Sequence, residues 1–132
     1  MFRNTVERHG DRHALSALIS ENRSDSDQKW KVWTWKDYWQ DAVNFAKALK
    51  FSKVKNFNTI NILGFNSPCW FIANAGSMLA SCIPAGIYYT NSADQCNFIT
   101  SHSKPAVLCI DSNEQLEKYI SYPLKDHVSP KR

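Results

Sequence analysis

The sequence predicts an α/β fold, in which a partial layered parallel sheet is preceded by a β-hairpin and an amphipathic helix. Three observations lead to this prediction. From Thr59 onward, apolar runs of strand length alternate three times with helix-start signals. The run without charged residues between Lys55 and Asp94 is broken by prolines. Upstream of this run, residues alternate with the period of two that is typical of a strand, and apolar residues at helical spacing follow. Repeated strand–helix units imply parallel strands with right-handed crossovers.

The first 13 residues are polar and charged, which indicates a short helix. His9 and His13 lie four positions apart and could share a metal-binding helix face, but no third ligand residue is near. Two solvated histidines are the favoured interpretation. Residues 14–19 form a strand candidate, and residues 21–29 are rich in turn-forming polar residues.

A second strand follows this polar stretch. Trp30, Val32 and Thr34 alternate with Lys31 and Trp33, as they would in a strand, so a hairpin is predicted. The tryptophans of this region could stack on nucleic-acid bases, but a core or interface role is much commoner.

A helix begins after this hairpin. Thr34 and Asp37 form a capping-box pattern. Beyond it, apolar residues recur at helical spacing while polar residues occupy the other face: Tyr38, Ala42, Phe45, Ala46 and Leu49. This is an amphipathic helix that packs on a larger body.

Three strand–helix units follow. Strands are predicted over residues 59–65, 84–89 and 105–110. The first helix, residues 69–83, has Ser67 as N-cap and Pro68 at its first position. The second runs from a Ser92–Gln95 capping box to about residue 102, and the third from a Ser112–Gln115 capping box to about residue 120.

The uncharged run also raises the alternative of a membrane span. A spanning helix needs about 20 continuous apolar residues, and Pro68 and Pro84 enclose a shorter piece. Its small residues fall on one helical stripe that would let the helix lie against a sheet: Ala73, Gly76, Ser77 and Ala80. Because strands covered on both faces are apolar throughout, a doubly covered sheet is the favoured interpretation, with membrane helix pairing as the alternative.

Composition narrows the class of protein. The 132 residues suit one domain, and a net charge of +4 is small for a nucleic-acid-binding protein. The four cysteines, at positions 69, 82, 96 and 109, fit no metal or redox spacing. They are predicted to be buried thiols of a protein in a reducing compartment, and no signal peptide is visible. A cytoplasmic location is therefore expected.

Most known catalytic patterns are missing. Glycines occur only at positions 10, 64, 76 and 86, which excludes a Walker loop and a dinucleotide fingerprint. No nucleophile–base arrangement can be assigned. Asp111 follows the third strand, at the edge where α/β folds bind ligands, but it is interpreted as a helix-capping or surface residue.

Two stretches carry a more specific pattern. "TWKDYW" (residues 34–39) and "ILGFNSPCWFIANAGSMLASCIPAGIYYTNSADQC" (residues 62–96) resemble the N-terminal subdomain of adenylate-forming enzymes. The likeness is greatest to long-chain fatty-acid–CoA ligases of the bubblegum type. "AVLCIDSNEQLEKY" (residues 106–119) resembles the next strand and helix. The chain departs from the family at "GSMLASC" (residues 76–82), where the family has a glycine-rich helix end.

The resemblance implies an activity of the parent family. A fatty-acid carboxylate attacks the α-phosphate of Mg-ATP to give an acyl-adenylate and pyrophosphate, and the thiol of coenzyme A then displaces AMP. The phosphate loop, the adenine motif and the C-terminal domain that perform these steps lie beyond this sequence. No catalytic, cofactor-binding or metal-binding residue can therefore be assigned here. Asn66, in the loop after the first parallel strand, is the only site-adjacent candidate, and a turn residue with an unusual backbone angle is its alternative interpretation.

The resemblance also implies an organisation. Residues 1–33 are an N-terminal segment with the hairpin, residues 34–120 a partial N-terminal subdomain, and residues 121–132 a loose tail. The expected function is that of an N-terminal fragment of the ligase, inactive alone, located in the cytoplasm or peripherally on endoplasmic reticulum or other membranes. Two alternatives stay open: a non-catalytic short isoform that pairs with a full-length ligase through an exposed sheet edge, and a flavodoxin-like nucleotide-binding protein.

Overall fold

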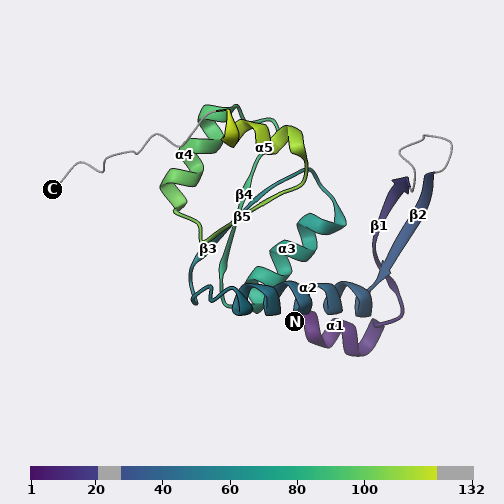
Figure 1. Cartoon of the computed structure of the whole chain (residues 1–132). Coiled ribbons are helices and arrows are strands. Elements are labelled where there is room, and N and C mark those ends of the chain that lie inside the picture. Colours follow the sequence, from purple (N-terminus) through teal and green to yellow (C-terminus); the bar gives the residue numbers. More distant parts are fainter. Residues whose placement is uncertain (21–27, 122–132) are drawn as a thin grey trace.

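The computed structural model describes residues 1–20 and 28–121, and it confirms the predicted α/β class (Figure 1). These two ranges contain ten elements: α1 (Phe2–His9), β1 (His13–Ser20), β2 (Gln28–Thr34), α2 (Trp35–Phe51), β3 (Thr59–Leu63), α3 (Pro68–Leu79), β4 (Ile83–Ile87), α4 (Ala93–Ser103), β5 (Val107–Ile110) and α5 (Asn113–Ile120).

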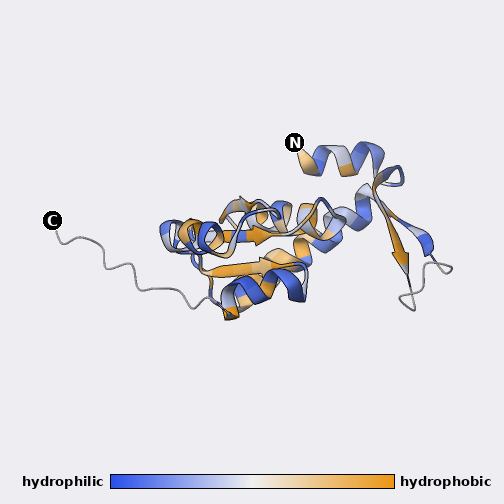
Figure 2. Cartoon of the chain, turned by 90° about the horizontal axis from the view of Figure 1, so that it is seen from above, coloured by the Kyte–Doolittle hydropathy of each residue, from blue (hydrophilic) through white to orange (hydrophobic). Residues whose placement is uncertain are grey.

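The predicted hairpin is formed by β1 and β2, which pair antiparallel and project away from the rest of the chain (Figure 2). The turn predicted over residues 21–29 lies mostly outside the described residues, and its last two positions belong to β2. Trp33 ties the hairpin to α2, because its indole Nε1–H donates to Asp41 at 3.1 Å. The N-terminal helix α1 packs through Phe2, whose ring lies 4.8 to 6.1 Å from those of Trp35, Tyr38 and Trp39. Trp33, Trp35 and Trp39 therefore make side-chain contacts within the chain.

Polar caps begin the helices largely where the sequence predicts them. Thr34 and Ser92 each form a complete capping box, and Ser67 accepts a hydrogen bond from the N–H of Trp70 at 3.2 Å. The third predicted box is only half formed. Ser112 accepts from the N–H of Gln115, but the buried Gln115 Oε1 has no hydrogen-bond partner among the described residues.

The larger sheet contains β4, β3 and β5 in that order, all parallel. Alternate residues of the central strand β3 face opposite layers. Ile60 and Ile62 pack with Ala73 of α3 and Leu49 of α2, whereas Leu63 packs with residues of α4 and α5. Helices α2 and α3 thus cover one face and α4 and α5 the other, as Figure 1 shows.

Three elements, α3, β3 and β4, end earlier than predicted, and the residues beyond their ends lie in loops. Helix α3 ends at Leu79, and Ser81 follows with a left-handed φ of 60° that no helix continues. Strand β3 ends at Leu63 and β4 at Ile87, two residues earlier than predicted in each case. Aromatic residues assigned to strands by their apolar character therefore lie in the loops beyond them.

The small-residue stripe of α3 contacts the sheet, as predicted, and also a helix, which was not predicted. A Cβ atom placed on Gly76 would lie 2.6 Å from the backbone oxygen of Ala42 and 2.8 Å from Cδ1 of Phe45, both on α2. Gly76 thus permits close approach of α3 to α2. Ala73 and Ala80 of the same stripe belong to the core that includes β3.

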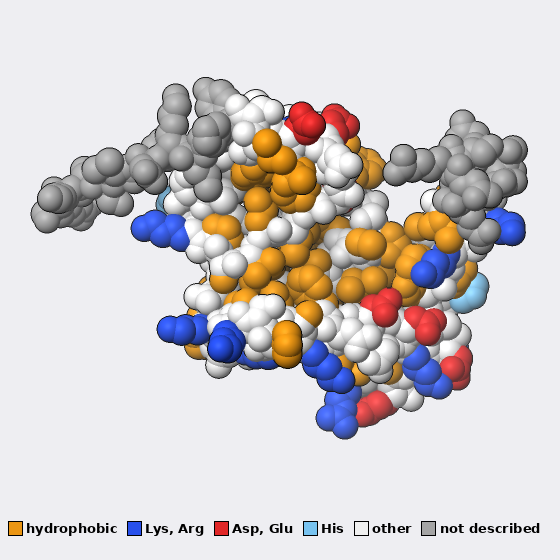
Figure 3. Space-filling model, in the orientation of Figure 1, with side chains coloured by type: hydrophobic (Ala, Val, Ile, Leu, Met, Phe, Trp, Pro, Cys, Tyr) orange, Lys and Arg blue, Asp and Glu red, His pale blue; other side chains and the backbone are white. Residues whose placement is uncertain are grey.

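The uncharged run is divided among β3, α3 and β4. Within the described ranges, no helix combines the length and the apolar character needed to cross a membrane. Figure 3 shows hydrophobic side chains gathered across the middle of one face, with charged side chains around them. The predicted burial of all four cysteines is wrong in part: Cys82 and Cys96 are buried, but Cys109 is half-buried and Cys69 is exposed.

Candidate ligand-binding hollow

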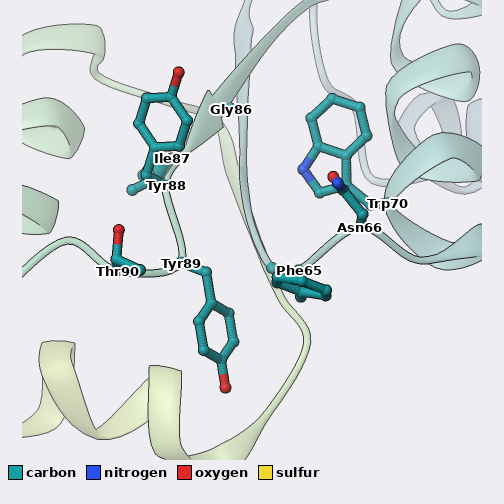
Figure 4. A pocket seen from close by; sticks show the side chains of 9 residues that line it. Phe65, Asn66, Trp70, Gly86, Ile87, Tyr88, Tyr89 and Thr90 are labelled. Carbon is teal, nitrogen blue, oxygen red and sulfur yellow. The ribbon is translucent and has the colours of Figure 1, made fainter.

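A hollow of about 510 Å³ lies at the carboxyl ends of β3 and β4 (Figure 4). The loop after β3, the first turn of α3, the end of β4 and the loop after it supply its lining: Gly64, Phe65, Asn66, Trp70, Gly86, Ile87, Tyr88, Tyr89 and Thr90. Open α/β sheets bind ligands at this edge. The volume lies within the range of about 300 to 1,000 Å³ that small-molecule sites span.

Aromatic rings form much of the lining. Phe65 and Tyr89 come from different loops and meet edge to face, with ring centroids 5.9 Å apart at 80°. Trp70 is held in the first turn of α3, where its N–H is bound by the Ser67 cap. Gly86 faces this indole, because a Cβ atom placed on it would lie 3.3 Å from Cζ2 of Trp70.

Asp111 fixes the loop after β3. Its Oδ2 accepts a hydrogen bond from the backbone N–H of Phe65 at 2.8 Å, and its own N–H donates to the oxygen of Leu63 at 3.2 Å. Gly64 makes this approach possible, since a Cβ atom there would lie 2.9 Å from the same carboxylate oxygen. Of the two interpretations of Asp111, the surface residue is confirmed, because Asp111 is exposed. The helix cap is not, because Ser112 caps α5 and Asp111 binds a neighbouring loop.

Lys118 of α5 fixes the loop after β4. Its Nζ donates to the backbone oxygens of Tyr89 at 3.0 Å and Asn91 at 2.7 Å, and it lies 5.9 Å from the Tyr89 ring centroid. Two of the three N–H donors of this ammonium group are thus used in hydrogen bonds to backbone carbonyl oxygens. The β5–α5 segment supplies both side chains that hold the rims of the hollow.

The electrostatics of the hollow limit its chemistry. Among the described residues that line it, none carries a charge. A triphosphate needs cationic side chains or a cradle of backbone N–H groups, and the described lining offers no cationic side chain to the phosphates of Mg-ATP. The described ranges hold no cluster of three metal-ligating side chains either. His9 ends α1 and His13 begins β1, so they share no helix face.

Asn66, the one site-adjacent residue that the sequence singles out, lines the hollow. It is not among the non-glycine residues with positive φ, so an unusual backbone angle does not explain it. Sequence reasoning missed Trp70, Tyr88 and Tyr89 as lining residues. The available signal was their position just after two apolar runs that end at the same edge of a parallel sheet.

The comparisons with known proteins agree with this fold. A family model described as "AMP-binding enzyme" matches residues 2–130. Human long-chain-fatty-acid–CoA ligase ACSBG2 is 36% identical over 122 residues, which are 92% of this chain and 17% of that protein. Mouse long-chain-fatty-acid–CoA ligase ACSBG1 is 32% identical over 120 residues, 91% of this chain and 16% of that protein. The chain thus spans about one sixth of the length of the curated relatives that it matches.

Solved structures share the fold. The A-PCP didomain of carboxylic acid reductase from Segniliparus rugosus, in complex with AMP, matches 91% of this chain with a TM-score of 0.78 at 18% identity. The fatty acid AMP ligase from Legionella pneumophila matches 88% with a TM-score of 0.72, also at 18% identity. This chain covers 18% and 20% of those two chains.

Proposed function

Because the chain belongs to the AMP-binding enzyme family, we propose that it is the N-terminal portion of an ATP-dependent long-chain fatty-acid–CoA ligase. The complete reaction would convert fatty acid, ATP and coenzyme A into acyl-CoA, AMP and pyrophosphate. The observation that carries this proposal is the 36% identity to human ACSBG2 over 92% of the chain. The order of its strands and helices is the order that the resemblance implies.

Within such an enzyme, the chain's role is to build one wall of the ligand cleft. The hollow lies at the ligand-binding edge of the sheet, and the loop from Gly64 to Pro68 forms part of its rim. Asn66 is the site-adjacent residue in this proposal. Its amide is one of the few polar groups there and is suited to orient a bound molecule by hydrogen bonding.

The catalytic groups of the reaction belong to other parts of the parent enzyme. Among its described lining residues, the hollow presents no charged side chain that could stabilise phosphoryl oxygens, and such electrostatic stabilisation is the main source of catalysis in these reactions. We therefore expect Mg-ATP and coenzyme A to be bound mainly by other segments, and the 132-residue chain alone to form no acyl-CoA.

A segment exchange tests the proposal. The matched 122 residues of human ACSBG2 are replaced by those of this chain, and acyl-CoA formation from a long-chain fatty acid, ATP and coenzyme A is measured. The exchanged enzyme should retain activity, while an enzyme lacking the segment and the 132-residue chain alone should have none. A folded exchange enzyme without activity would reject the ligase role, and acyl-CoA made by the chain alone would reject the division of labour.

A second candidate function rests on the sheet edges. The outer strands β4 and β5 each pair on only one side among the described residues, and Ile83 of β4 is 51% exposed. Open edges are templates for pairing with another chain. A non-catalytic module would use them to bind a full-length ligase, and it would co-purify with a tagged ligase. The ligase-portion proposal predicts no such stable pairing.

A further inference from the structure

We propose that Lys118 is a positioning residue for ligand binding in the hollow, because it holds the loop after β4 so that the Tyr89 ring stays against Phe65. This inference rests on the proposed function, in which the hollow forms one wall of a ligand cleft. Lys118 is not among the residues that line the hollow. It lies on α5 and reaches the loop with its ammonium group.

The loop after β4 depends on Lys118 for part of its hydrogen bonding. Residues 88–91 connect β4 to the N-cap of α4. Within this loop, the N–H of Asn91 donates to the oxygen of Tyr88 at 3.1 Å. The carbonyl oxygens of Tyr89 and Asn91 instead accept from Nζ of Lys118, at 3.0 and 2.7 Å. Hydrogen bonds from a charged donor are stronger than neutral ones, so this contact fixes the path of the loop.

The same ammonium group also contacts the Tyr89 ring. Nζ of the half-buried Lys118 lies 5.9 Å from the ring centroid, within the distance of about 6 Å at which a cation attracts a ring face. Lys118 thus holds both the backbone and the side chain of Tyr89. In agreement with this, Tyr89 is half-buried, whereas its neighbour Tyr88 is 81% exposed.

The Tyr89 ring carries this constraint to the opposite rim. Its centroid lies 5.9 Å from that of Phe65, at 80°, and Figure 4 shows the two side chains on adjacent loops. Phe65 is itself held by Asp111 through its backbone N–H. Loss of the Lys118 bonds would therefore free Tyr89 to move away from a fixed partner. The lining would change shape, and a bound ligand would lose contact surface.

A purely structural role of Lys118 is the alternative. Lys118 lies in the last turn of α5, where a cation also interacts favourably with the helix dipole. That interaction stabilises the helix, but it does not depend on the Tyr89 ring. The test must therefore show that the effect of Lys118 on ligand binding passes through Tyr89.

Hydrogen exchange in the whole 132-residue chain tests the first step. Lys118→Met keeps most of the apolar stem and removes the donors. The peptide covering residues 88–92, which includes the Asn91 N–H, should exchange about tenfold faster, as the loss of a hydrogen bond to a charged group implies. Peptides from α2 and α3 should be unchanged. Lys47→Met, at an exposed position of α2 outside the hollow, is the matched control.

Enzyme kinetics test the second step. In the active segment-exchange enzyme, Lys118→Met should raise the KM for one of the three substrates by about tenfold and leave kcat nearly unchanged, as a loss of binding alone does. Lys118→Arg, which keeps hydrogen-bond donors, should recover part of this loss. In a Tyr89→Ala enzyme, Lys118→Met should cause no further rise in KM, because the ring that it positions is absent.

The outcomes separate positioning from structure. Unchanged exchange of residues 88–92 in Lys118→Met would overturn the inference, and so would unchanged KM values for all three substrates. An equal rise in KM with and without the Tyr89 ring would assign Lys118 a structural role. Failure of the proposed function is a different result, an inactive segment-exchange enzyme, and hydrogen exchange in the chain itself does not depend on it.

Discussion

At the scale of single residues, Asp111 and Gly64 illustrate how one contact can depend on two positions far apart in the sequence. The carboxylate of Asp111 reaches the N–H of Phe65 only because Gly64 has no Cβ atom in its way. A hydrogen bond to a charged group is stronger than a neutral one. The loop after β3 is therefore held by Asp111, which directly follows β5. Strand β5 lies on the opposite side of β3 from β4.

Removal of the Asp111 carboxylate should loosen this loop. Asp111→Ala should lower the free energy of unfolding by about 1 to 2 kcal/mol, since a bond to a charged group is lost at a solvent-accessible site. Asp111→Asn, which keeps an acceptor oxygen, should lose less. Urea denaturation measures the difference, with Glu117→Ala on the exposed face of α5 as the control. Equal stability of all three variants would show that the bond does not hold the loop.

The four cysteines should differ in reactivity. Burial raises the pKa of the Cys96 thiol, and burial also raises the pKa of Cys109. Because the thiolate is the reactive form, N-ethylmaleimide at neutral pH should modify the exposed Cys69 first. Intact-mass spectrometry should show one rapid addition to the native chain and none to Cys69→Ser. Rapid addition to the serine variant would contradict the described burial.

At the scale of elements, the contact between α2 and α3 is closer than side chains normally allow. Gly76 lies against the backbone of Ala42 and the ring of Phe45, so the two helices meet through a glycine. Small residues on α3 are needed for this close contact with α2, in addition to the packing of α3 on the sheet. It also places Ala73 and Ala80 in the core with β3.

The substitution Gly76→Ala should reveal this closeness. At an exposed helical position, glycine to alanine would raise stability by about 0.5 to 1 kcal/mol. Here the added methyl group overpacks the interface, so we expect a net loss of about 1 to 3 kcal/mol, measured by chemical denaturation. Met78→Ala, at a 56% exposed position of the same helix, should change stability little. A more stable Gly76→Ala variant would show that the helices can separate without cost.

The two complete capping boxes should respond differently to acid. Hydrogen bonds from the Thr34 hydroxyl and backbone N–H hold the pKa of Asp37 below its ordinary value of 3.8. The carboxylate therefore contributes stability above the unfolded-state pKa, and the contribution is lost as the pH falls through the lower folded-state value. The Ser92 box uses Gln95, which does not titrate in this range.

A comparison of two cap variants measures this difference. Thr34→Ala should destabilise the chain at neutral pH, and the deficit should shrink once the pH falls well below 3.8. Ser92→Ala should cost about 1 kcal/mol at both pH values. Denaturant unfolding at neutral and at strongly acid pH gives both differences. A Thr34→Ala deficit that does not change with pH would show that Asp37 contributes nothing as an anion.

At the scale of the whole molecule, the sequence predicts the fold better than the site. Strand–helix alternation and polar caps are local signals, so the hairpin, the order of elements and most helix starts are confirmed. The hollow depends on where strands stop, and an apolar run such as that through Phe65 does not distinguish a buried strand from an aromatic loop. The contacts of Asp111 and Lys118 with distant loops also cannot be read from spacing, because they arise only when β5 and α5 pack beside β3.

The sheet topology has a consequence for how the chain folds. Strand β3 is central although it is the first of its sheet to be synthesised, and Ile60 pairs with Pro84 and also with the much later Val107. Doubling the length of a closed loop costs only about 0.6 kcal/mol more in entropy, so the pairing of β5 with β3 is only slightly less favourable for its longer loop. Contacts between residues distant in the sequence do, however, form more slowly. During translation β4 becomes available to β3 before β5 does, because β4 precedes β5 along the chain. Asp111 and Lys118 follow β4 along the chain, so neither rim of the hollow can be fixed by its side-chain contact until this later segment has been synthesised.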